Sequence, residues 1–309
     1  MNFALKHDLF GWKLISNDIN LKCMRKLNRR QFIGKATVGL GAFALSQTPW
    51  LVSAAKFSNI PIGFQSWSVR DMLSKDFPGT LKLMSGQGYQ LVEMCSPKGY
   101  SDSGFGSLVN MKTSDMRKTI TDAGLNCPSC HFGLNELTND LDDRIQFAHD
   151  LGLTQMVCSS FGLPKTATVS DFQNDADKLN KAAEKIKTAG MQAGFHNHEG
   201  EFAMGDGQLI YDALMSRLNG DLVKMQFQTE VINLGYKAST YFRKYPGRFI
   251  SSHLSDWTAD KKEVPVGQGV IDWKDFFAAA QTGGVKNFFV EMAFDKFKDS
   301  AVYIRELKS

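Results

Sequence analysis

Short apolar segments recur about every thirty residues from Ile60 onward, which is the size of one strand–helix–strand unit. Between them lie amphipathic segments with apolar residues at helical spacing, such as Leu141–Leu151, Asp171–Thr188 and Trp273–Ala280. This alternation indicates parallel strands connected by helices. The predicted strands are Ile60–Ser66, Gln90–Met94, Asn126–His131, Gln155–Ser159, Met191–His196, Val223–Gln228, Phe249–Leu254 and Asn287–Met292.

Eight consecutive units favour a closed α/β barrel, the (β/α)8 or TIM barrel, over residues 56–309. The competing architecture is an open doubly wound sheet, which usually has fewer strands and a G-x-G-x-x-G turn after its first strand. The first predicted strand ends in Gly63-Phe64-Gln65-Ser66 and lacks that turn. We therefore predict the barrel.

Residues 1–55 have the layout of an export signal. A twin-arginine pair, Arg29-Arg30, precedes an apolar run from Ala36 to Leu45 and a small-residue cleavage site at Val52-Ser53-Ala54. This order resembles a Tat signal, which predicts passage through the Tat translocase to the periplasm. A membrane anchor is the alternative, but it would need about 20 apolar residues. Met24 opens a more conventional signal, so the sequence leaves open whether translation starts at Met1 or at Met24.

Removal of this segment changes the charge balance of the chain. Residues 1–54 hold eight of the 36 basic and two of the 32 acidic residues, which leaves 28 and 30 and a net charge of −2. A basic surface for nucleic acid is therefore not expected. The sequence leaves homo-oligomerisation open.

Four cysteines follow the predicted signal: Cys95, Cys127, Cys130 and Cys158. Cys127 and Cys130 have C-x-x-C spacing, and the periplasm would permit a disulfide between them. A redox C-x-x-C usually opens a helix, however, whereas this one lies in a predicted strand. We expect ordinary cysteines buried in the core.

Polar side chains stand at the carboxyl ends of most predicted strands, where barrels of this kind carry their functional residues. Residues two apart on a strand share a face, so Gln226 and Gln228 are expected to point inward together, as are His196 and His198. Inward polar groups are costly unless they pair or bind a ligand. The converging residues are Gln65, Glu93, His131, His196, His198, Gln228, His253 and Glu291.

These segments resemble the sugar phosphate isomerase/epimerase family of xylose isomerase-like TIM barrels, over essentially the whole chain after the signal. Residues 194–202 resemble the family's H-N-H-x-x-E-F block, and His253–Asp256 with Val266–Trp273 resembles its H-x-K-D and G-x-G-x-I-D-W pair. The first, second and last strands are also similar, at Ile62–Asp71, Gly88–Glu93 and Val290–Glu291.

The resemblance implies a divalent metal held by Glu, Asp, His and Glu from strands five to eight. The corresponding residues here are His196, Gln228, His253 and Glu291. Two imidazoles, an amide and a carboxylate neutralise a cation poorly, which favours Zn, Mn, Co or Ni over Mg. Ser255 replaces a common lysine, so we expect an unphosphorylated sugar or keto-sugar.

The metal would make the proton next to the sugar carbonyl removable. We expect Glu291 to act as base, with His198, Glu93 or Glu201 as its proton partner. Gln65, Trp67, Arg70, His131, Asp256 and Trp257 are the expected substrate-binding residues.

The predicted function is that of an exported sugar isomerase or epimerase. A keto-sugar lyase or dehydratase could use the same metal and base. The amide of Gln228 favours a third hypothesis, a non-catalytic periplasmic sugar-binding protein. A DNA-repair endonuclease is disfavoured by the acidic exported chain and by too few ligands for a trinuclear zinc site.

Overall fold

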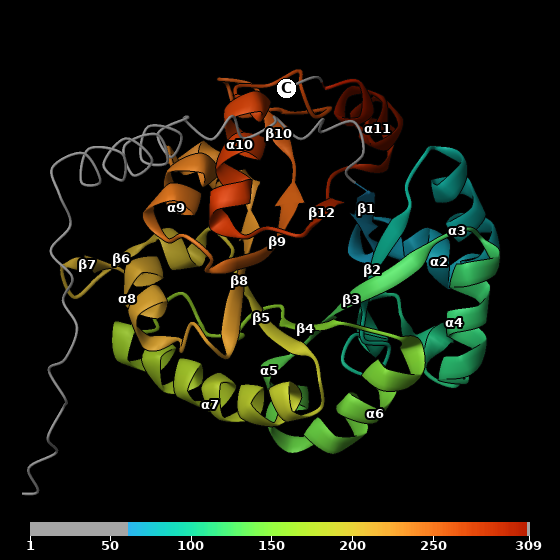
Figure 1. The fold of residues 1–309 in the computed structure, drawn as a ribbon, viewed down its shortest axis with the longest axis horizontal. Coiled ribbons are helices and arrows are strands. Elements are labelled where there is room, and N and C mark those ends of the chain that lie inside the picture. Colours follow the sequence, from blue (N-terminus) through green and yellow to red (C-terminus); the bar gives the residue numbers. More distant parts are fainter. Residues whose placement is uncertain (1–60, 308–309) are drawn as a thin grey trace, which may run out of the picture. The chain divides into compact units, whose positions relative to one another are not determined.

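The computed structural model describes residues 61–307, which form the predicted barrel (Figure 1). The barrel closes because β1 pairs in parallel with both β2 and β12. The predicted Tat signal and the boundary at residue 56 lie outside the described residues. The barrel strands are β1 (Ile62–Gln65), β2 (Leu91–Cys95), β3 (Asn126–Phe132), β4 (Gln155–Cys158), β5 (Gln192–His196), β8 (Val223–Gln228), β9 (Phe249–Leu254) and β12 (Asn287–Val290).

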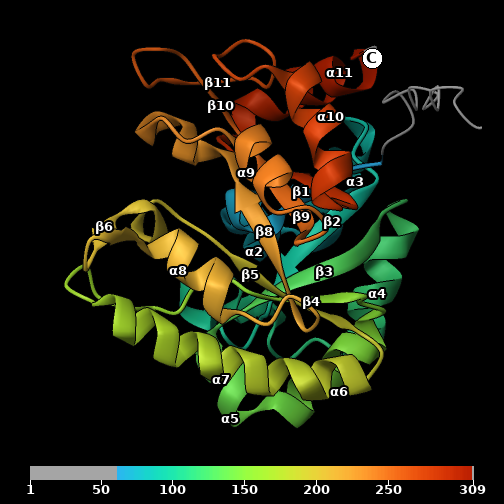
Figure 2. The ribbon, with the colours of Figure 1, turned by 60° about the vertical axis from the view of Figure 1, so that its left-hand side comes forward.

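Helices surround the barrel (Figures 1 and 2). They are α2 (Arg70–Lys75), α3 (Phe77–Gly86), α4 (Thr113–Asp122), α5 (Leu134–Asn139), α6 (Leu141–Leu151), α7 (Val169–Thr188), α8 (Ile210–Arg217), α9 (Ala238–Lys244), α10 (Trp273–Gly283) and α11 (Phe297–Glu306). Two short hairpins lie in the loops after β5 and β9: β6 (Met204–Gly205) with β7 (Gln208–Leu209), and β10 (Asp256–Trp257) with β11 (Glu263–Val264). Within residues 61–307, no helix has the length and apolar character needed to cross a membrane.

All eight predicted strands are confirmed, with small shifts at some ends. The last strand ends at Val290, so Glu291 follows it instead of lying within it. Helix α7 begins at Val169, before the predicted Asp171, because Thr168 and Asp171 cap it reciprocally. That exchange satisfies two backbone N–H groups at the helix start.

The apolar core lies between the strands and the helices. The Phe227 ring on β8 meets Phe242 of α9 edge-on at 5.7 Å, and Phe242 meets Phe276 of α10 at 5.4 Å. All three rings are buried. The outward residues of the strands therefore pack on the helices, which leaves the inward ones to form the polar interior.

The barrel has two irregularities of register, and both lie beside polar interior residues. Between Leu91 and Glu93 the partner strand β3 has an extra residue, next to Pro128, which has no N–H to donate. Between Met225 and Gln226 the extra residue is in β9. Bulges change the direction of neighbouring side chains, and here they flank Glu93 and Gln226.

The four cysteines of the described residues are buried free thiols, as expected. Cys127 and Cys130 both lie in β3, and burial raises the pKa of Cys127 to about 12. A thiol with so high a pKa is a poor nucleophile. The C-x-x-C segment is therefore part of the barrel wall.

Candidate active site

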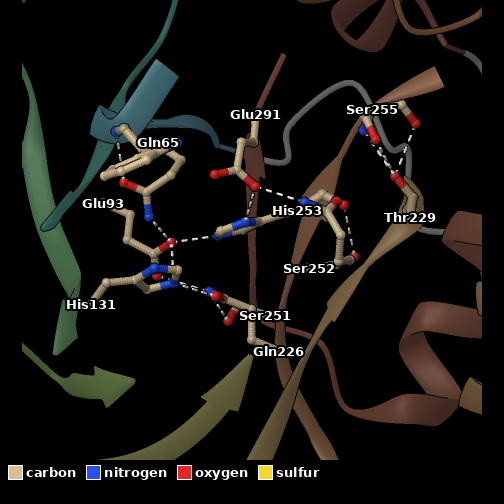
Figure 3. A network of polar contacts seen from close by, with 12 residues as sticks. Gln65, Glu93, His131, Gln226, Thr229, Ser251, Ser252, His253, Ser255 and Glu291 are labelled. Atoms are coloured by element: carbon tan, nitrogen blue, oxygen red, sulfur yellow. Dashed lines mark hydrogen bonds and ion pairs between the residues drawn. The ribbon is translucent and has the colours of Figure 1, made fainter. Parts of the chain in front are cut away.

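A cluster of polar side chains fills the carboxyl end of the barrel (Figure 3). Because all eight strands are parallel, their carboxyl ends meet at one rim. Gln65, His196 and Gln228 are the last residues of β1, β5 and β8, and Glu291 directly follows β12. The alternation of residues along the strands is what turns these side chains inward.

Glu93 lies at the centre of this cluster and is fully buried. One of its oxygens, Oε2, accepts hydrogen bonds from Gln65 Nε2 at 2.6 Å and His253 Nε2 at 2.5 Å. The other, Oε1, accepts from Ser129 Oγ at 2.5 Å and Gln226 Nε2 at 2.8 Å. Burial raises the pKa of Glu93, but the His131 and His253 imidazoles outweigh it and lower the pKa to about 2. Glu93 is thus an ionised, fully bonded carboxylate that organises the cluster.

His253 is sandwiched between two carboxylates. Its Nε2 faces Glu93, and its Nδ1 lies 2.8 Å from Oε2 of Glu291. Burial alone would lower the pKa of His253, but Glu291 and Glu93 raise it to about 10. Both ring nitrogens therefore carry protons at neutral pH, and His253 can ligate a metal only after losing one of them.

Three imidazoles gather at this rim. Ligand nitrogens of His131, His196 and His253 lie within 4.8 Å of one another, and the ring centroids of His196 and His253 are 4.4 Å apart. Burial lowers the pKa of His131 and His196, which keeps both rings neutral. The sequence placed His131 with the substrate, whereas the structure groups it with the two predicted histidine ligands.

Two buried polar atoms of the cluster have no hydrogen-bond partner: Nδ1 of His196 and Oε1 of Gln228. The amide of Gln228 donates through Nε2 to Glu291 Oε2 at 2.6 Å, which leaves its carbonyl oxygen free. Buried polar atoms are rarely left unpaired without a reason. Since imidazole nitrogen and amide oxygen are both metal ligands, the donor set fits a borderline divalent cation.

A cavity of about 870 Å³ opens beside this cluster. Of the residues predicted for the site, those that line it are Trp67, His131, His196, His198, Glu201 and Glu291. Gln65, Glu93, Gln228 and His253 are buried and lie outside this lining. The structure therefore distinguishes residues that line the cavity from buried residues of the cluster behind them.

Glu201 and His198 lie on the loop after β5. The His198 side chain is exposed, and its ring centroid lies 4.7 Å from that of His196. Glu201 is only 6% exposed and accepts a hydrogen bond from the His198 backbone N–H at 2.7 Å. Burial raises the pKa of Glu201 to about 7. A carboxyl group with this pKa, in a cavity wall, can both take up and release a proton near neutral pH.

Arg70 and Trp67 form a stacked pair. The Arg70 guanidinium lies 4.2 Å from the Trp67 ring centroid and donates from Nη1 to the Trp67 carbonyl at 2.8 Å. The Trp67 ring also meets Tyr100 edge-on at 5.9 Å. Trp67 lines the cavity and Arg70 does not, so Arg70 positions the indole.

Asp256 and Trp257 also lie outside the cavity lining. Asp256 is fully buried, and its Oδ2 accepts from the backbone N–H groups of Gly267 and Gly269 and from Trp273 Nε1 at 2.8–3.0 Å. Asp256, expected from the sequence to bind the substrate, is thus bonded to N–H groups of the protein itself. Asp256 ties the loop 265–273 to the end of β9.

Replacing Asp256 by alanine is expected to lower the free energy of unfolding by about 2–3 kcal/mol, because it leaves the buried Trp273 Nε1 and two partly buried backbone N–H groups without an acceptor. Urea denaturation followed by circular dichroism measures the change. Asp102→Ala, at an exposed site, is the matched control. Equal stability of the two variants would contradict the assignment.

Several cavity residues have no recognisable signal in the sequence. Tyr100 and Ser159, whose hydroxyls are hydrogen-bonded to each other, lie on loops after β2 and β4. Phe161 and Leu163 follow Ser159 on the same loop. Loops have no periodicity that predicts which side chains face a cavity.

The fold and the rim define a TIM barrel with a histidine–carboxylate centre beside an open cavity. The chain belongs to the xylose isomerase-like TIM barrel family, whose model matches residues 81–307. No curated protein matches the sequence.

Several solved structures have the same fold. A sugar phosphate isomerase/epimerase from Parabacteroides distasonis is 22% identical with a TM-score of 0.70, over 84% of this chain and 97% of that one. An L-ribulose 3-epimerase is 17% identical with a TM-score of 0.55, over 80% and 86% of the two chains. The IOLI protein with a bound zinc atom is 14% identical with a TM-score of 0.58, over 80% and 94%. At these identities the likeness concerns the fold.

Proposed function

We propose that this protein is an isomerase or epimerase that moves a proton at the carbon next to the carbonyl group of an unphosphorylated sugar or keto-sugar. The observation that carries the proposal is the meeting of three imidazoles with the Glu291 carboxylate beside one cavity, which His131, His196 and Glu291 line. The names of the Parabacteroides and L-ribulose structures support the same class of reaction.

His131, His196 and His253 would hold a divalent cation, together with the free oxygen of Gln228 and the carboxylate of Glu291. When bound, such a cation polarises a carbonyl and makes the neighbouring proton more acidic. The zinc in the IOLI structure agrees with a borderline metal. Zn, Mn, Co and Ni remain the candidates.

Glu201 is the better candidate for the proton-moving group, in place of the first choice from sequence, Glu291. Burial raises the pKa of Glu291, but the charge of His253 outweighs it and lowers the pKa, so Glu291 is a weak base. Glu201 lines the same cavity with a pKa of about 7. His198 lies at the mouth beside it, and Trp67 offers a face on which a sugar ring can stack.

The test is proton exchange with solvent. Metal-loaded protein is incubated in D2O with a panel of unphosphorylated keto-sugars, and nuclear magnetic resonance follows deuterium entry next to the carbonyl and any new sugar. Exchange with formation of an epimer or isomer supports the proposal. Loss of a substituent from the sugar identifies the lyase alternative, and binding without exchange identifies a sugar-binding protein.

Elemental analysis of the purified protein is expected to find about one divalent metal per chain. His196→Ala removes an unpaired buried nitrogen and should lower the affinity by about 10–100-fold or more. Gln228→Asp adds a negative charge at the site and should raise the affinity. Unchanged metal content in His196→Ala would contradict the assigned ligands.

The proposal includes export to the periplasm, which rests on the twin-arginine segment of residues 29–54. Replacing Arg29 and Arg30 by lysine should keep the protein in the cytoplasm, as cell fractionation would show.

A further inference from the structure

Besides polar residues of the centre, the cavity is lined by a set of apolar side chains. These come from the loop after β4, from the start of α7, from the segment between β5 and α8, and from the first residue of α8. We call this set the apolar wall; its residues are Phe161, Leu163, Ala167, Phe172, Phe202 and Ile210.

The apolar wall is held rigidly by aromatic packing behind it. The Phe161 ring lies 4.4 Å from Phe195 of β5 and 6.5 Å from Phe172 of α7. On the other side, Phe202 stacks on Tyr211 at 4.5 Å. These rings face the cavity from a packed layer, so the apolar wall is a preformed surface.

Leu163 is partly exposed within the wall, and Leu234, which also lines the cavity, is 44% exposed. Apolar side chains gathered around a cavity, unlike single exposed ones, usually mark a binding surface. A sugar alone does not account for them, because its hydroxyl groups need polar partners. The volume of about 870 Å³ is also near the upper end of the range for drug-sized ligands, about 300–1,000 Å³.

We infer that the substrate is a sugar bearing an apolar, ring-sized substituent, which the apolar wall and Leu234 bind while the sugar ring lies at the histidine cluster. This inference rests on the proposed function and names its substrate class. The reacting carbon would then lie at the polar end of the cavity, and the substituent would lie beside the loop of residues 159–168. Recognition of the substituent would then contribute affinity without taking part in proton transfer.

The test compares two probes that share a sugar, methyl and phenyl β-D-glucopyranoside, in calorimetric titrations of the zinc-loaded protein. The phenyl glycoside is expected to bind about tenfold more tightly or better, because its ring leaves water on binding. Leu163→Asn combined with Leu234→Asn should remove most of this advantage, so that the two glycosides bind with similar affinity. Leu83→Asn on α3 is the matched control, since Leu83 is 43% exposed and lies outside the cavity lining.

Equal affinity for the two glycosides, or a phenyl advantage that survives both cavity substitutions, would overturn the inference and leave the proposed function intact. Failure of both glycosides to bind would overturn it as well, and deuterium exchange with keto-sugars then shows separately whether the proposed function holds. Circular dichroism confirms that the double variant is folded. Because Leu234 is exposed, its substitution alone provides a second folded variant.

Discussion

Glu93→Ala is expected to destabilise the barrel by about 3–5 kcal/mol, the cost of removing one partner from a buried ion pair. Four donors converge on this carboxylate, from Gln65, Ser129, Gln226 and His253. Without it they remain buried beside one another, and the charge of His253 keeps only Glu291 as its counterion.

The free energy of unfolding, from urea titration at neutral pH, measures this effect. Glu184→Ala on the exposed face of α7 is the matched control and should change stability by less than about 0.5 kcal/mol. A loss as small in Glu93→Ala as in the control would show that Glu93 does not organise the cluster.

The same variant should also change the pH dependence of stability. The pKa of Glu93 is lowered from 4.5 to about 2, so its contribution is present above pH 4.5 and is lost as the pH falls toward 2. The pKa of His253 is raised from 6.5 to about 10, so its contribution is present below pH 6.5 and is lost as the pH rises toward 10. The stability difference between wild type and Glu93→Ala is therefore largest between about pH 4.5 and 6.5.

The barrel and the inward direction of its rim residues follow from sequence because both depend on short-range patterns. Strand spacing gives the eight units, and alternation along β8 places Gln226 and Gln228 on the inner face. Both amides bond to carboxylates across the barrel interior, to Glu93 and Glu291. That contact joins strands distant in the chain, and no local pattern specifies it.

The remaining site depends on three-dimensional packing. Asp256 follows a rim strand, as a substrate-binding residue could, but the loop 265–273 folds back and its backbone N–H groups occupy the carboxylate. His131 and Gln65 both lie near the carboxyl ends of their strands, yet only His131 reaches the cavity. The pKa is raised at Glu201 and lowered at Glu291 because burial and nearby charge balance differently at the two carboxyl groups, and this balance likewise arises only in the folded chain.

Glu201→Gln is expected to slow deuterium exchange of the substrate by about 100-fold or more, the usual contribution of a positioned general base. Glutamine keeps the shape of the side chain and can still accept the hydrogen bond from the His198 N–H. It cannot take up the proton. Stability should therefore change little while the rate falls.

The pH profile distinguishes this role from a structural one. A base with a pKa of about 7 must lose its proton to act, so the wild-type rate should fall as the pH drops below about 7. The residual activity of Glu201→Gln should lack that limb. Glu199→Gln, in the same cavity wall but exposed, is the matched control and should keep both the rate and the profile. If Glu201→Gln retains the wild-type profile, or if Glu199→Gln loses as much activity, the proton is moved by another group. Glu291 then becomes the first candidate, because among residues 61–307 it is the other buried or half-buried carboxylate that faces the cavity.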